Sequence, residues 1–112
     1  MGHVVHHAIV VTGGVKDCAE RAHDKAVALD LHPTSIVQSH TNGDYSFLIG
    51  PDGSKSGWPE SEAGDERREA FKAWCSSPMT KVWVHWVEIA YGPDHGRPEI
   101  TDSSDAREPD DE

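Results

Sequence analysis

The chain has 112 residues, with ten lysines and arginines against twenty aspartates and glutamates, which gives a formal net charge of −10. This length suits one domain with one core and leaves no room for a separate catalytic domain. The acidic balance repels a phosphate backbone, so we expect no nucleic-acid binding. The longest apolar run has four residues, so we expect neither a membrane span nor a secretory signal, and we expect a cytoplasmic protein.

The acidic residues are concentrated at the end of the chain. From Asp94 onward there are eight acidic residues and two arginines, a net charge of −6. This segment has one isoleucine and no aromatic residue, so it can bury little apolar surface to offset the chain entropy lost on ordering. We therefore predict a folded domain over residues 1–96 and a disordered acidic tail over residues 97–112, which can be removed without loss of folding. The simplest function of such a tail is to keep the protein in solution.

The first predicted element is a strand over residues 3–12. Its β-branched and apolar residues occupy both alternating faces, which is typical of a strand at the centre of a sheet. A helix over residues 13–31 follows, with a narrow stripe of small apolar side chains at spacings of three and four. The residue before Pro33 is pushed out of the helical region, so the helix ends there.

Two further strands are predicted over residues 35–40 and 45–50. They are joined across Asn42 and Gly43, and Asn-Gly is the strongest local signal for a β-hairpin.

A second helix is predicted over residues 64–77, with Asp65 as its N-terminal cap. A last strand over residues 81–92 closes the domain. The order β-α-β-β-α-β predicts a single ferredoxin-like α+β domain, in which two helices cover one face of a four-stranded antiparallel sheet.

The last strand carries apolar and aromatic residues on both faces, so one row is exposed in a monomer, and such a row usually marks an interface. We favour homodimerisation through the uncovered sheet face, with a long loop or the tail folding over the sheet as the alternative. Two tryptophans of this strand, at positions 83 and 86, point to opposite faces, so only one should lie at an interface. The candidate interface residues are Trp83, His85, Trp86, Val87, Ile89 and Tyr91.

A glycine-rich loop over residues 50–58 combines serines, a lysine and a tryptophan. Its backbone N–H groups and lysine could hold an anion, its tryptophan offers a stacking face, and arginines of the following helix offer a fork for phosphate. In the alternative interpretation the tryptophan only fastens the loop to the domain, and the cations are solvated or paired with nearby glutamates. The candidate ligand-binding residues are Ser54, Lys55, Ser56, Trp58, Arg67 and Arg68.

The remaining reactive side chains indicate no reaction. Adjacent histidines of a strand point to opposite faces, so His6 and His7 cannot meet at one metal ion without a bulge, and no HxxxH pair completes a site. Cys18 and Cys75 lie far apart without C-x-x-C spacing and are predicted to be reduced thiols. Neither cysteine has a recognisable nucleophile context, and no G-x-S-x-G occurs. We expect no metal, no cofactor and no catalytic residue.

Five short patterns lie between about residues 6 and 96. They are a His-His pair at the first strand, N-G-x-x-S-F, P-D-G-S-K-x-G-W, G-D-x-x-R-x-x-F-x-x-W and W-V-E-x-x-Y-G. In these patterns the chain resembles a group of short, mostly uncharacterised proteins of actinobacteria and of the phages that infect them. The resemblance implies a small accessory protein in the cytoplasm of a bacterial host cell and implies no activity.

Two classes of function stay open, and both are non-enzymatic. The first is a phage-associated accessory protein, a homodimer that binds a basic host protein through its acidic surface or its sheet face. The second is a protein that binds or sequesters a small anionic, nucleotide-like ligand at the glycine-rich loop. An enzyme is a third class, which we favour less.

Overall fold

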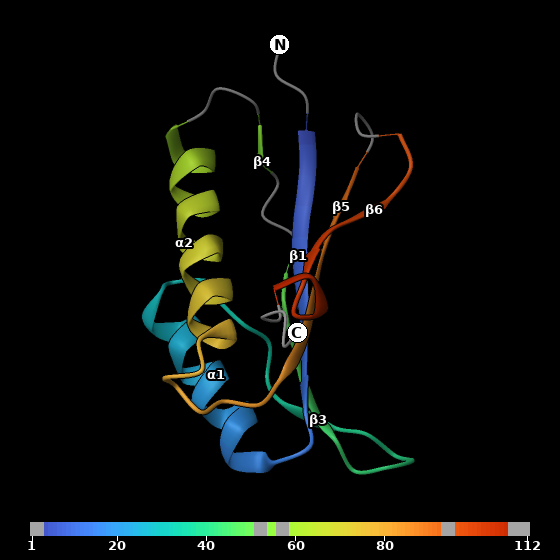
Figure 1. The fold of residues 1–112 in the computed structure, drawn as a ribbon. Helices are drawn as coiled ribbons and strands as arrows, with labels where there is room; N and C mark the ends of the chain where they lie inside the picture. Colours follow the sequence, from blue (N-terminus) through green and yellow to red (C-terminus); the bar gives the residue numbers. More distant parts are fainter. Residues whose placement is uncertain (1–3, 51–53, 56–58, 93–95, 108–112) are drawn as a thin grey trace.

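The structure, a computed structural model, describes residues 4–50, 54–55, 59–92 and 96–107, with the backbone alone for residues 4, 54–55 and 59–61. Two helices lie on one side of an antiparallel sheet (Figure 1). The chain is therefore an α+β protein with two helices, as predicted. Of the helices in the described residues, neither is long and apolar enough to cross a membrane.

The sheet is built around its longest strand, β1 (Val4–Gly13). Strand β3 (Tyr45–Ile49) pairs with β1 on one side, and β5 (His85–Tyr91) pairs with it on the other, both antiparallel. The prediction that the first strand is central is confirmed. Ile9 and Val11 of β1 point toward the helices and are almost completely buried.

Shorter strands complete the sheet, whose main path runs in the order β2-β3-β1-β5-β6. β2 (Val37–Gln38) is much shorter than its prediction, and β4 (Ser54–Lys55) pairs with the beginning of β1. The predicted hairpin turn between β2 and β3 is present: Gly43 has a φ of 77°, and the Asn42 side chain accepts a hydrogen bond from the backbone N–H of Asp44 at 3.0 Å. A positive φ favours glycine, which explains the Asn-Gly pair.

The helices pack on the same face of the sheet through small and aromatic side chains. α1 (Lys16–Ala28) buries four small residues, and these let its backbone approach the sheet closely. α2 (Pro59–Ser76) begins before the predicted position, so Asp65 lies inside the helix and is not its cap. Proline suits the first turn of a helix, because its fixed φ is helical and its missing N–H has no partner there. The core contains Ile9, Val11, Cys18, Ala22, Ala26, Phe47, Ile49, Phe71, Cys75, Val82, Val84 and Trp86.

The fifth strand on the main path comes from the segment that we expected to be disordered. β6 (Glu99–Ser103) pairs antiparallel with β5 and is followed by a short 3₁₀ helix, η1 (Asp105–Arg107). The prediction of a four-stranded sheet is therefore wrong. The prediction of disorder over residues 97–112 is wrong for residues 99–107. The prediction of disorder rested on the low apolar content of this segment. In the structure, hydrogen bonds and ion pairs with α2 and β5 hold the segment in place.

Truncation after Pro98 tests how much the C-terminal segment contributes. Because Asp102 and Thr101 contact buried charged groups of α2 and β5, their removal leaves those groups with fewer partners. We expect the free energy of unfolding to fall by about 2–4 kcal/mol. Urea denaturation of the full chain and of the truncated chain measures this difference. Equal midpoints and equal slopes would show that β6 adds nothing to stability.

Candidate functional site

One face of the sheet is left uncovered by the helices, and we call it the open face. The strand register places its residues in rows that run across the sheet: Val10 lies opposite Leu48 in β3 and Val87 in β5, and Ile89 lies opposite Ile100 in β6. Val10 and Ile100 are 38% and 68% exposed. The open face consists of His6, Ala8, Val10, Thr12, Val37, Ser46, Leu48, His85, Val87, Ile89, Tyr91, Ile100 and Ser103, of which Ala8 is buried among its neighbours.

The open face carries no acidic, lysine or arginine side chain among its described residues. Apart from β4, whose side chains are not described, the strands contribute three charged residues. Glu88 and Asp102 point toward α2, where both contact Lys72, and Glu99 occupies the register position opposite the buried Ala90. In a chain with a net charge of −10, this leaves an apolar and neutral surface on the side away from the helices.

The predicted alternation of the last strand is confirmed by its burial. Trp83, just before β5, is 71% exposed, whereas Trp86 is 3% exposed and packs under the helices. Of the candidate interface residues, His85, Val87, Ile89 and Tyr91 lie on the open face of β5. Trp83 belongs to the same alternating row as these residues.

Trp86 has to be removed from the candidate interface. Its ring N–H donates to the Ser76 hydroxyl at 3.3 Å, and the Arg107 guanidinium lies 5.6 Å from its ring centroid. Both partners lie on the helix side of the sheet, since α2 and η1 supply them. Trp86 therefore fixes the end of α2 over β5 and is not available to a partner on the open face.

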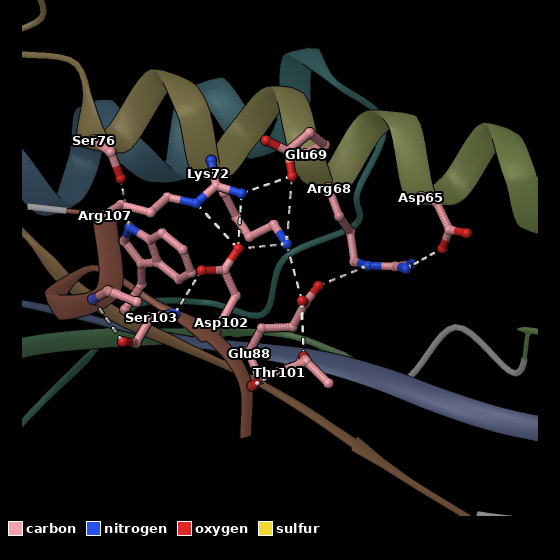
Figure 2. A network of polar contacts seen from close by, with 12 residues as sticks. Asp65, Arg68, Glu69, Lys72, Ser76, Glu88, Thr101, Asp102, Ser103 and Arg107 are labelled. Atoms are coloured by element: carbon pink, nitrogen blue, oxygen red, sulfur yellow. Dashed lines mark hydrogen bonds and ion pairs between the residues drawn. The ribbon is translucent and has the colours of Figure 1, made fainter. Parts of the chain in front are cut away.

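A buried charged cluster lies on the opposite side of the sheet, between α2 and β5 (Figure 2). Arg68, Lys72 and Glu88 are 5%, 7% and 5% exposed. The Glu88 carboxylate accepts a hydrogen bond from Arg68 Nε at 3.1 Å and one from Lys72 Nζ at 2.9 Å. Arg68 also pairs with Asp65 one turn earlier in α2. Because each buried charge has an opposite charge and a hydrogen bond, the cluster avoids the cost of an unpaired buried ion.

The same cluster extends to the C-terminal segment (Figure 2). Lys72 Nζ lies 3.2 Å from Asp102 of β6, and the Thr101 hydroxyl donates to Glu88 at 2.9 Å. Arg107 of η1 then joins Asp102 to Glu69 of α2, with both distances at 2.7 Å. β6 and η1 are thus fastened to α2 by charged side chains.

The contacts of this cluster explain the direction of its pKa shifts. Burial by itself raises the pKa of the Glu88 carboxyl, but hydrogen bonds from Lys72 and Thr101 and the charges of Lys72 and Arg68 hold that pKa below the usual 4.5. For Asp102, burial is likewise outweighed by Arg107 and Lys72, and its pKa lies below 3.8. All of these carboxylates are ionised at neutral pH.

The structure separates the candidate ligand-binding residues of the glycine-rich loop. Ser56 and Trp58 lie outside the described residues, and Ser54 and Lys55 are described only as the backbone of β4. Arg67 is exposed on α2, whereas Arg68 is buried in the charged cluster with two carboxylates. Arg68 is therefore committed to the fold, and anion binding by the remaining loop residues stays a prediction.

Metal binding and thiol chemistry gain no support from the described part of the chain. In that part, no group of three or more histidine, cysteine or acidic residues could hold a metal ion. The two cysteines are free and buried. Burial raises the pKa of the Cys75 thiol to about 12, so this thiol stays neutral and is a poor nucleophile at neutral pH.

Comparisons of the chain with protein-family models, with curated proteins and with solved structures give no match. The site is therefore interpreted from its own geometry.

The charged cluster left a weak signal in the sequence. Arg68 and Lys72 are spaced by four on the same helical face as Phe71 and Cys75, and Glu88 interrupts an otherwise apolar alternating row of β5. Charged residues at positions that pattern as buried are expected to pair with each other. The sequence could not indicate Asp102, because it lies between the polar residues Thr101 and Ser103 in a segment with little apolar patterning.

Replacing Glu88 with glutamine tests the cluster. Glu88→Gln leaves Arg68 and Lys72 buried with less opposite charge, and we expect a loss of about 3–5 kcal/mol in the free energy of unfolding. Glu66→Gln is the matched control, because Glu66 is exposed on α2 and should change stability by less than about 0.5 kcal/mol. Both values come from chemical denaturation at neutral pH, and similar losses in the two variants would contradict the assignment.

The lowered pKa values also predict a pH dependence of stability. A carboxyl whose folded pKa is depressed stabilises the fold fully above its unfolded value, here about 4.5 for Glu88 and 3.8 for Asp102. That contribution is lost as the pH falls through the lower folded values. We expect denaturation midpoints to fall steeply below about pH 4.5, and less steeply in Glu88→Gln. An equal acid sensitivity of the variant and the wild type would show that Glu88 does not contribute.

Proposed function

We propose that the protein is a non-enzymatic interaction protein that forms a homodimer through the open face of its sheet. The observation that carries the proposal is the group of apolar residues on the open face that no described segment covers, in which Val10 and Ile100 are exposed and Val87, between their two strands, is half-buried. Uncovered apolar surfaces of this kind usually mark a protein interface. The two cysteines are buried, and Arg68, Lys72 and Glu88 are buried and paired with one another, which supports a non-enzymatic role.

A second copy of the chain suits the open face better than a charged partner does. Two copies with a net charge of −10 each repel one another over most of their surfaces. The open face is the exception, because its described residues carry no acidic side chain. Sheet-to-sheet contact brings the two neutral surfaces together and keeps the carboxylates of the helix side away from the interface.

We further propose that the two helices and strands β1, β2, β3 and β5 form a ferredoxin-like core, to which β6 adds an edge strand. The order β2-β3-β1-β5 and the placement of both helices on one face support this assignment (Figure 1).

The biological setting stays a proposal as well. We infer an accessory protein that acts in the cytoplasm of a bacterial host cell, in association with a phage, and binds a basic host protein. The acidic net charge supports a basic partner, since charge complementarity speeds association and excludes other acidic proteins. In this arrangement the open face joins the two copies and the acidic exterior faces the partner.

A pair of matched variants tests the interface. Val87→Glu places a charge on the open face, and Val27→Glu places the same charge on the exposed surface of α1. By sedimentation velocity at micromolar concentration, we expect the wild type and Val27→Glu to sediment as dimers, at twice the chain mass of 12.3 kDa. Val87→Glu should sediment as a monomer, because a buried unpaired charge costs several kcal/mol at an interface.

Far-UV circular dichroism of both variants confirms that each is folded. A monomeric wild type, or a dimer that Val87→Glu leaves intact, would rule out the open face as the interface between copies.

A further inference from the structure

A hollow of about 740 Å³ lies where α2 ends, between the residues that lead into β5 and the turn from β6 into η1. It falls within the range of about 300–1,000 Å³ that is usual for small-molecule sites. Of the ligand-binding residues suggested by the sequence, Arg67 and Arg68 have described side chains, and neither lines the hollow.

The interior of the hollow is apolar and has an aromatic wall. Cys75, Val82 and Val84 line it and are buried, and Trp83 lines it while 71% of its surface is exposed. The Cys75 thiol behaves here as a small apolar group, because it carries no charge at neutral pH. A flat ring could therefore pack against the Trp83 indole without displacing charged groups.

The charged residues that line the hollow are more basic than acidic, in contrast to the chain as a whole. They are Lys81, Arg107 and one carboxylate, Asp105. Arg107 is held by Asp102 and Glu69. The Lys81 ammonium, in contrast, takes part in none of the ion pairs among the described residues. An ammonium that has no carboxylate partner among the described residues and lies beside an apolar hollow favours a ligand with an anionic group.

Hydrogen bonds within the protein fix the conformation of the segment that contains Lys81 and Trp83. Arg21 of α1 donates hydrogen bonds to the backbone oxygens of Thr80, at 2.7 Å, and of Lys81, at 3.5 Å. The Thr80 hydroxyl donates to the backbone oxygen of Trp74 at 3.2 Å. These contacts maintain Lys81 at a φ of 56°, a left-handed conformation that is unfavourable for a residue other than glycine. A segment ordered in advance loses less entropy when a ligand binds.

We infer that this hollow binds a small organic anion with a flat aromatic ring. The ring packs against Trp83 and the apolar interior, and the anionic group lies near the Lys81 ammonium. The site does not require the proposed dimer, because a monomer contains all the residues that the inference uses. Trp83 also belongs to the alternating row of the candidate interface.

The experiment titrates the full-length protein with 1-naphthalenesulfonate and, in parallel, with the neutral 2-naphthalenemethanol. Two-dimensional ¹H–¹⁵N NMR reports which residues respond. We expect saturable shifts at the Trp83 indole N–H and at the backbone amides of residues 77–84, and a dissociation constant about fivefold lower for the anion than for the neutral compound.

Matched variants then separate the two contacts. Lys81→Gln should weaken binding of the anion about fivefold and leave the neutral compound unaffected, whereas Lys16→Gln, on the exposed start of α1, should change neither. Trp83→Ala should weaken both compounds about tenfold, whereas Met79→Ala, at an exposed position outside the hollow, should weaken neither. Thermal denaturation of each variant confirms that it is folded.

Three outcomes would overturn the inference. They are shifts confined to the open face around Val10 and Val87, equal affinities of the wild type for the two compounds, and an anion affinity that Lys81→Gln leaves unchanged. An absence of saturable shifts at millimolar concentrations of both compounds would also exclude the site.

Discussion

The buried carboxylate of Glu88 is the group on which the arrangement of α2, β5 and β6 depends. It lies in the middle of an otherwise apolar row of β5, so it can be buried only where cations reach it. Arg68 and Lys72 of α2 supply those cations, one turn apart on the helix. Because the hydrogen bonds require close contact, they fix both the position and the rotation of α2 over the sheet. An apolar row alone would allow the helix to slide more freely.

Glu88 also determines where the chain continues after β5. Its contact with Lys72 leaves that ammonium within reach of Asp102, and Asp102 in turn binds Arg107. The C-terminal segment thereby becomes part of the sheet although it buries little apolar surface. Most of this acidic chain would repel an acidic segment. The C-terminal segment is nevertheless held beside α2, where the cations Arg68, Lys72 and Arg107 pair with carboxylates (Figure 2).

The placement of the charged cluster also determines which side chains the open face carries. Strand residues alternate between faces, so the strand carboxylates of the cluster all point toward the helices. The open face is left with aliphatic, hydroxyl and imidazole side chains. Its edge meets the hollow, since His85, Ser104 and Asp105 border both the hollow and a smaller depression on the open face. An occupant of either surface therefore contacts the same turn between β6 and η1.

The sequence by itself determined the features that depend on neighbouring residues. It indicated two helices and a central first strand, and it placed the hairpin turn at Asn42-Gly43, because a left-handed glycine conformation is a local requirement. It also placed Trp83 and Trp86 on opposite faces, since the alternation of a strand is independent of its surroundings. Only the tertiary structure decided that Arg68 serves the fold, that the helices cover the face of Trp86, and that residues 99–103 form a strand. These outcomes rest on ion pairs between groups far apart in the chain, such as Lys72 and Asp102. The energy of such pairs depends on burial and distance, which local composition does not contain.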